Sequence, residues 1–262
     1  MDDPKELAVW LDTALSASTL VPDIRELRPG ITHDEAYRLQ LEVMARRVAA
    51  GDRIVGYKAA LTSPAMQAQV GIDEPLLGTL LGSRIVTGSE PVSISGWGFL
   101  RPTLEPEIAV VLGRDLQGPG VTRIDALRAI AGYLPAIELG DYRTSVEVGQ
   151  TFIGAVVCNT FNGGIVLGQP YVAPAGIDLR REGMTMTHNG KPAGSGTGVE
   201  VLGDPINSVI FIANKLAEYG HGLRAGMILM TGSIVASIPL AAGDDVDVEF
   251  TQLGAVRVRM AA

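Results

Sequence analysis

FLRPTLEPEIAVVLG, residues 99–113, is the stretch from which we predict the fold of this chain. It alternates between polar and apolar residues and then becomes an apolar run ended by glycine, which is typical of a strand entering a core. Glu105 and Glu107 are two residues apart, so on a strand both carboxylates point to one face. Pro106 between them cannot donate a ladder hydrogen bond, which indicates an edge strand or a bulge, and bulges often re-aim side chains near active sites.

A second apolar segment, residues 133–139 (YLPAIEL), carries Glu138 near its end. Three carboxylates on two strands could hold a divalent cation, and hard oxygen ligands suit magnesium, manganese or calcium. The alternative is that these acids face solvent, as acids on strands usually do. The spacing alone leaves both interpretations open.

Five segments together resemble one family: residues 33–40 (HDEAYRLQ), 56–81 (GYKAALTSPAMQAQVGIDEPLLGTLL), 104–113 (LEPEIAVVLG), 135–141 (PAIELGD) and 196–233 (GTGVEVLGDPINSVIFIANKLAEYGHGLRAGMILMTGS). The chain is similar to the hydratase/decarboxylase branch of the fumarylacetoacetate hydrolase superfamily. That branch includes 2-oxopent-4-enoate hydratases and 4-oxalocrotonate decarboxylases. The resemblance covers nearly the whole chain, in order and with similar spacing.

Short strands separated by glycine-rich turns, with an amphipathic helix among them, predict an α+β fold. The resemblance implies a small N-terminal helical part and a larger, mixed β-sheet body of barrel-like form. We expect an N-terminal helical and strand region over residues 1–80 and a catalytic β-rich domain over residues 81–262. The resemblance also implies a homo-oligomer, to which a partner enzyme of the same pathway could bind.

Composition excludes some classes of protein. The net charge of −8 over 262 residues argues against nucleic acid as a partner. No apolar run of about eighteen residues predicts a membrane span. The acidic N-terminus has no signal-peptide pattern, and the single cysteine, Cys158, cannot form an intrachain disulfide. We therefore expect a cytoplasmic protein, with Cys158 in the core.

The resemblance assigns roles to several residues. It implies that Glu105, Glu107 and Glu138 hold Mg²⁺ (or Mn²⁺), and that Lys58 reaches into the active site beside the bound substrate. Gly56, two residues before Lys58 on the same strand face, would leave room for a ligand.

Other residues are expected near the substrate. Ser233, in the sequence TGS, resembles a family turn near the substrate, but we identify no base that would make it a nucleophile. Asp141, Tyr142 and Arg143 begin an expected active-site loop that runs to Gly149.

Two positions depart from the hydratase pattern. Many hydratases carry an aspartate where this chain has Leu76, and relatives often carry serine where it has Phe161 or Asn162. We expect Leu76 and Phe161 to make the substrate pocket more apolar. Loss of a titratable group at position 76 argues against simple hydration and leaves decarboxylation or a different substrate open.

The resemblance implies a small 2-oxo acid as substrate. The first hypothesis is a hydratase that converts a 2-hydroxy-2,4-dienoate from aromatic meta-cleavage into a 4-hydroxy-2-oxo acid. The second is a 4-oxalocrotonate-type decarboxylase, and the third is a non-catalytic relative that only binds a small acid. Intact Lys58 and three glutamates argue against the third.

Local patterns predict several further elements. Thr32 and Glu35 form a capping box at the start of a helix, where His33 is expected to carry no chemistry. Asn189 and Gly190 predict a type I′ hairpin turn. The remaining expected elements are strands at 53–61, 150–159, 227–230, 234–238, 246–251 and 255–260, and helices at 4–17, 65–70 and 205–219.

Overall fold

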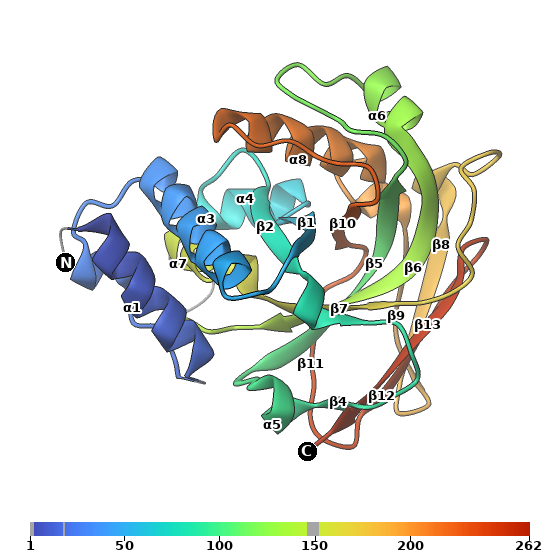
Figure 1. Ribbon diagram of the computed structural model, residues 1–262. Helices are drawn as coiled ribbons and strands as arrows, with labels where there is room; N and C mark the ends of the chain where they lie inside the picture. The colour runs from blue at the N-terminus through green and yellow to red at the C-terminus, as the bar shows by residue number, and fades with distance from the viewer. Residues whose placement is uncertain (1–2, 18, 146–151) are drawn as a thin grey trace.

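The computed structural model describes residues 3–17, 19–145 and 152–262. Three N-terminal helices form one side of the molecule, and two β-sheets form the rest (Figure 1). The predicted α+β class, with a helical N-terminal part and a curled, barrel-like sheet body, is confirmed. No helix within the described ranges combines the length and the apolar character needed to span a bilayer.

The N-terminal helices are α1 (Pro4–Ser16), α2 (Ile24–Leu27) and α3 (His33–Ala49). The predicted capping box is present: the Thr32 hydroxyl accepts from the Glu35 backbone N–H, and the Glu35 carboxylate accepts from the Thr32 backbone N–H. Helices α1 and α3 lie side by side (Figure 1). The buried face of α3 packs against the short helix α7 (Phe152–Val157), which brings the helical layer to the edge of the larger sheet.

The larger sheet has the strand order β2-β1-β10-β5-β6-β7-β3, and β11 adds to β5. Its centre is the long antiparallel pair of β5 and β6, and helix α8 covers β10 and β1 (Figure 1). The strands are β1 (Ile54–Ala60), β2 (Leu76–Leu81), β3 (Ile85–Val86), β5 (Pro102–Leu112), β6 (Ile130–Asp141), β7 (Asn162–Leu167), β10 (Ile228–Ser233) and β11 (Ile238–Pro239).

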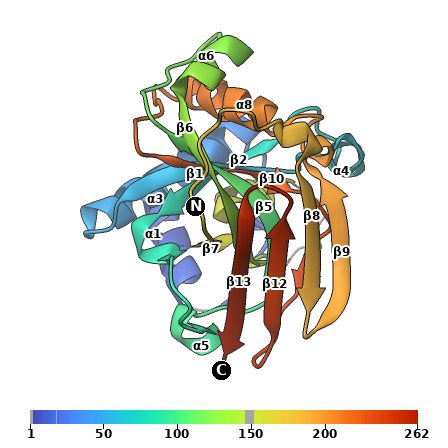
Figure 2. The ribbon, with the colours of Figure 1, turned by 90° about the vertical axis from the view of Figure 1, so that its right-hand side faces the viewer.

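The second sheet has the order β4-β13-β12-β8-β9 and stands against the first through β13, as Figure 2 shows. The predicted hairpin is confirmed, with Asn189 and Gly190 both at positive φ between β8 and β9. The strands are β4 (Val92–Ser93), β8 (Gly183–His188), β9 (Lys191–Thr197), β12 (Asp245–Phe250) and β13 (Gly254–Ala261). The remaining helices are α4 (Pro64–Val70), α5 (Ile94–Trp97), α6 (Arg123–Ala129) and α8 (Pro205–Glu218).

The predicted domain boundary near residue 80 stays a prediction. Strands β1 and β2, which precede that boundary, are hydrogen-bonded into the same sheet as β5, β6 and β10. The sheet therefore unites the two predicted regions at the place where Lys58 lies on β1.

The strand predicted over residues 150–159 is wrong. Residues 152–157 form helix α7, while residues 150 and 151 lie outside the described residues. A short apolar run does not distinguish a buried strand from a buried helix. Here the helix is selected by its neighbour α3, from which the Gln40 side-chain amide donates to the backbone carbonyl of Val156 at 2.7 Å.

The strand predicted over residues 234–238 is also wrong for most of its length. Strand β10 carries one extra residue between Met230 and Ser233 opposite β5, and Gly232 in this bulge has a φ of +113°. The Ile234 backbone N–H still donates to the Pro106 carbonyl at 3.1 Å, but the chain then leaves the sheet, and strand pairing with β5 resumes at β11. Pro106 faces this irregularity, although β5 itself is paired on both sides and is not an edge strand.

Candidate metal centre and active-site cavity

Three glutamates from two paired strands converge on one point. Glu105 and Glu107 share a face of β5, as the spacing predicts, and Glu105 lies directly opposite Glu138 on β6. One carboxylate oxygen from each residue lies within 4.8 Å of the other two. Glu107 and Glu138 are almost fully buried, at 0% and 1% exposure. The alternative in which these acids face solvent is therefore excluded for Glu107 and Glu138, while Glu105 is partly exposed and lines a cavity.

The hydrogen bonds of this cluster leave two oxygens without a partner. Glu107 Oε2 accepts from the Gly232 backbone N–H at 2.7 Å. Glu138 Oε1 accepts from the Asn162 side chain at 2.8 Å and pairs with Lys58 Nζ at 3.0 Å. Glu107 Oε1 and Glu138 Oε2 are buried and have no hydrogen-bond partner among the residues that the structure describes. Unsatisfied buried carboxylate oxygens are costly, and hard divalent cations prefer such ligands, so the cluster fits a magnesium-type ion.

Burial dominates the electrostatics of the cluster. Burial, reinforced by the charge of Glu138 and opposed by Lys58, raises the pKa of Glu105 to about 7. The pKa of Glu107 is raised well above its usual range, first by burial and then by Glu138 and Glu105. Burial alone would lower the pKa of Lys58, but the charges of Glu138, Glu105 and Glu107 raise it. One ammonium thus faces three carboxylates, which leaves an excess of negative charge that a proton or a cation must compensate.

A cavity of about 400 Å³ lies over this cluster. Lys58, Glu105 and Glu138 line it, and so do the predicted substrate-binding residues Leu76, Phe161 and Ser233. Their roles toward a substrate stay predictions. The rest of the lining is partly polar and partly apolar. Hydroxyl groups come from Thr62, Ser63, Thr103, Tyr142, Thr144, Thr160 and Ser237. Apolar groups come from Leu61, Met66, Val70, Phe152, Ala155, Ile234, Val235 and Ala236.

Lys58 lies on β1 between β2 and β10 and is 3% exposed. Gly78, its partner on β2, provides the space for its stem, because a Cβ at Gly78 would lie 3.0 Å from Lys58 Cγ and 2.2 Å from Thr160 Oγ1. The expectation that Gly56 leaves room for a ligand is wrong. A Cβ at Gly56 would lie 1.7 Å from the Ile228 carbonyl oxygen, so this glycine permits the close approach of β10.

The structure also bears on the expectations for Ser233, His33 and Cys158. Ser233 donates its hydroxyl to the Val235 carbonyl at 2.6 Å, which agrees with a residue that is not an activated nucleophile. His33 packs against Phe152 with ring centroids 4.3 Å apart and does not line the cavity. Cys158 is buried in the core as predicted, and burial raises the pKa of its thiol to about 12.

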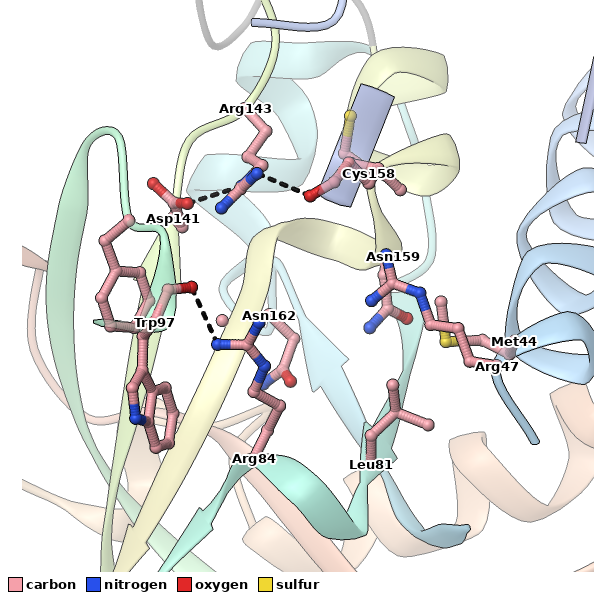
Figure 3. A pocket seen from close by; sticks show the side chains of 13 residues that line it. Met44, Arg47, Leu81, Arg84, Trp97, Asp141, Arg143, Cys158, Asn159 and Asn162 are labelled. Carbon is pink, nitrogen blue, oxygen red and sulfur yellow. Dashed lines mark hydrogen bonds and ion pairs between the residues drawn. The ribbon is translucent and has the colours of Figure 1, made fainter. Parts of the chain in front are cut away.

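The predicted active-site loop contributes Tyr142 and Thr144 to the cavity, while residues 146–149 lie outside the described residues. Arg143 instead points into a separate small cavity of about 50 Å³ (Figure 3). There it donates to Asp141 Oδ2 at 2.6 Å, to the Leu15 carbonyl at 2.7 Å and to the Gly98 carbonyl. These bonds join the end of β6 to α1 and α5, so Arg143 is a structural residue.

Sequence reasoning missed Glu200 and the role of Asn162 at the site, whereas Tyr142 lies in the predicted active-site loop. Tyr142 packs against Phe161, with the ring centroids 4.8 Å apart. Asn162 holds Glu138, and Glu200 is an exposed acid at the cavity wall. Asn162 had a signal, because it stands where relatives often carry serine. Glu200 had none, because it reaches the cavity only through the packing of a one-turn 3₁₀ segment, Gly198–Glu200.

Comparison with known proteins gives the family. Residues 53–261 match the family described as fumarylacetoacetate (FAA) hydrolase C-terminal. The chain is 35% identical over 247 residues to the 2-hydroxyhexa-2,4-dienoate hydratase of Comamonas testosteroni, covering 93% of this chain and 92% of that enzyme. It is 36% identical over 231 residues to a 4-oxalocrotonate decarboxylase of Pseudomonas putida, covering 88% and 86% of the two chains.

Solved structures agree with this result. The 4-oxalocrotonate decarboxylase of Pseudomonas putida G7, complexed with magnesium and adipate, has a TM-score of 0.93 and 34% identity, over 98% of this chain and 97% of that one. The chain therefore belongs to the fumarylacetoacetate hydrolase family. Its predicted resemblance to the hydratase/decarboxylase branch is confirmed.

The charge excess predicts a pH dependence of stability that a cation reverses. Glu105 titrates near pH 7 in the folded chain and near 4.5 when unfolded. The folded state therefore binds more protons between these values, and stability without metal should fall as pH rises through that window. Mg²⁺ binds only the folded, deprotonated cluster, so it should raise Tm much more at pH 8 than at pH 5.

The variant Glu107→Gln removes one buried carboxylate. It therefore tests whether the excess negative charge of the cluster causes the pH dependence of stability. It should lose less stability between pH 5 and pH 8 without metal, and Mg²⁺ should raise its Tm little at either pH. Exposed Glu42→Gln is the control and should behave as the wild type. Thermal unfolding with and without Mg²⁺ at both pH values decides the matter, and an undiminished Mg²⁺ effect in Glu107→Gln would rule out this carboxylate as a ligand.

Proposed function

We propose that this protein is a metal-dependent lyase that adds water to the 2-oxo-enoate formed from a 2-hydroxy-2,4-dienoate, giving a 4-hydroxy-2-oxo acid. The observation that carries the proposal is the meeting of Glu105, Glu107, Glu138 and Lys58 beneath one cavity. The hydratases among its relatives support this choice of reaction.

In this proposal Glu105, Glu107 and Glu138 hold a divalent cation, Mg²⁺ or Mn²⁺. When bound, such a cation supplies positive charge that favours the enolate form of a 2-oxo acid. The residues themselves bind and orient the substrate. Among the described residues that line the cavity, Lys58 is the only cation, so the negatively charged 2-oxo acid end of the substrate is expected to lie beside it.

Lys58 has a second role in the proposal. Its ammonium is paired with Glu138 at 3.0 Å and Lys58 is only 3% exposed, so its charge acts more strongly than it does in solvent. As the keto oxygen gains negative charge, its attraction to Lys58 increases. The interaction is then stronger in the transition state than in the bound substrate, so it lowers the activation barrier as well as improving substrate binding. Lys58 is therefore the proposed catalytic residue.

A second candidate reaction is decarboxylation of a 2-oxo acid with a second carboxylate, as in 4-oxalocrotonate decarboxylases. One observation favours it: Leu76 lies in the cavity wall at 1% exposure, where many hydratases carry an aspartate. Both reactions pass through the same kind of enolate, so the carboxylates and Lys58 serve either. The proposal also takes from the sequence a cytoplasmic homo-oligomer, to which a partner enzyme of the same pathway could bind.

The reaction itself can be tested directly. Mg²⁺-loaded protein should consume 2-hydroxy-2,4-dienoates, with loss of the dienol absorbance and no release of carbon dioxide. The same assay with 2-oxo-enedioates should release little carbon dioxide. Turnover that releases carbon dioxide in step with substrate loss would replace hydration by decarboxylation, and no turnover of either class would contradict the proposed function.

Replacement of Lys58 by methionine tests its catalytic role. Lys58→Met keeps most of the buried stem but removes the charge, so kcat should fall by roughly 10²–10³-fold, as for the loss of one preorganised donor. Mg²⁺ binding should not weaken, because the lost ammonium competes with the cation for Glu138. The exposed Lys191→Met is the control and should keep wild-type kcat. A raised KM at unchanged kcat would reduce Lys58 to an anchor for the substrate carboxylate.

Replacement of Leu76 tests which reaction the cavity wall selects. Leu76→Asp should raise the ratio of hydration to decarboxylation about tenfold or more, since a placed acid–base group contributes roughly 10²–10⁴-fold to proton transfer. Leu76→Asn is the matched control, because asparagine has the same shape as aspartate and cannot titrate. Both products are measured on variants whose circular dichroism shows a native fold. An equal ratio in the two variants would show that position 76 does not manage protons.

A further inference from the structure

We propose that the cavity selects substrates whose end remote from the 2-oxo acid is uncharged and apolar, and that it discriminates against dicarboxylates. This inference rests on the proposed function, since it assumes that the 2-oxo acid end lies at Lys58 and the glutamates. It names the substrate class within that function. It also separates the two candidate reactions, because 4-oxalocrotonate carries a second carboxylate.

The charges that line the cavity carry the first part of the inference. Across the described lining residues the one cation is Lys58, and it already pairs with Glu138 at 3.0 Å. The other charged lining residues are acids, namely Glu105, Glu138 and Glu200. A second substrate carboxylate inside the cavity would thus meet no positive partner and would be repelled by Glu200, which costs binding energy.

Two cations near the cavity, Arg143 and Lys215, are held by other partners. Arg143 follows the lining residue Tyr142, but its guanidinium points into the other cavity (Figure 3). It donates there to Asp141, to the Leu15 carbonyl and to the Gly98 carbonyl. Lys215 lies behind His33 and Tyr37 and pairs with Glu74 at 2.8 Å and Glu218 at 2.9 Å. Neither could reach a distal carboxylate without giving up these partners.

The second part of the inference, the preference for an apolar distal group, rests on the apolar walls of the cavity. Helix α4 presents Met66 and Val70 to the cavity, and helix α7 presents Phe152 and Ala155. Leu76, which replaces a family aspartate, adds to the same apolar lining. An alkyl or aryl group that leaves water for these walls gains up to about fourfold in affinity for each methylene buried.

The size of the cavity permits such a group. Its volume of about 400 Å³ is within the range of roughly 300–1,000 Å³ that small-molecule sites span. Met66 is 40% exposed, so the apolar wall reaches the mouth of the cavity at α4. A substituent longer than that of the simplest 2-oxo acids can therefore be covered by protein on its way to solvent.

A matched pair of stable acids tests the inference by binding, without turnover. 2-Oxohexanoate and 2-oxoadipate have the same six carbons and differ only in a terminal methyl or carboxylate. Calorimetric titration of Mg²⁺-loaded protein should give 2-oxohexanoate a Kd at least about tenfold lower than that of 2-oxoadipate, as expected when a desolvated charge lacks a partner. Equal affinities would overturn the inference and leave the proposed function standing, whereas binding of neither acid would contradict the proposed function itself.

Variants at the mouth test whether charge is the cause. Met66→Arg places a cation at the apolar wall and should improve 2-oxoadipate binding about two- to fivefold, the gain expected of a largely exposed ion pair, with little change for 2-oxohexanoate. Met66→Gln is the uncharged control of similar length and should keep the wild-type ratio. Glu200→Gln should also lower the ratio of the 2-oxoadipate Kd to the 2-oxohexanoate Kd, as Met66→Arg should. A ratio that stays at its wild-type value in both Met66→Arg and Glu200→Gln would overturn the electrostatic argument.

Discussion

The structure of the site depends on the burial of three carboxylates against a single ammonium. Two like charges about 5 Å apart repel by roughly 3 kcal/mol at an effective dielectric constant near 20, and the carboxylates of Glu105, Glu107 and Glu138 lie within this separation. The ion pair of Lys58 with Glu138 offsets only part of that repulsion. Protons or a divalent cation must neutralise the remaining negative charge. The folded chain therefore presents a carboxylate site that a divalent cation can occupy in place of protons.

The sheet holds this unfavourable cluster in place because its four charged groups come from three strands of one hydrogen-bonded sheet. Strand β5 supplies Glu105 and Glu107, β6 supplies Glu138 and β1 supplies Lys58. The bulge in β10 turns the Gly232 N–H toward Glu107, and β7 begins with Asn162, which holds Glu138. After this bulge and the hydrogen bond from Ile234 to Pro106, the chain leaves the sheet, and residues 234–237 become one wall of the cavity. Charge placement and cavity shape therefore have a common structural origin.

The sequence predicts part of this arrangement by physics alone. The two-residue spacing of Glu105 and Glu107 requires a shared strand face, and the capping box at Thr32 and the hairpin at Asn189 follow from local chemistry. The meeting with Glu138 depends on register, because only the pairing of Glu105 with Glu138 brings the third acid to the cluster. That register is a property of the whole sheet, and the family resemblance supplied it where spacing could not.

The wrong predictions have physical causes of the same kind. Residues 152–157 form a helix because α3 offers them a packing face, which a short apolar run cannot reveal. Gly56 serves the approach of β10 and not a ligand, since the partner strand is unknown until the sheet is formed. Glu200 reaches the cavity from a segment far from Lys58 in sequence, so no local pattern marks it as a neighbour.

The central claim is that the three glutamates form one cation site beside Lys58. Crystals grown at pH 8 with Mn²⁺ and measured for anomalous scattering test it most directly. The account predicts one strong peak between Glu105, Glu107 and Glu138, with an oxygen of each carboxylate within about 2.0–2.6 Å, and with Lys58 still paired to Glu138. Occupied manganese at another position, or carboxylates that remain in place with no peak between them, would contradict it.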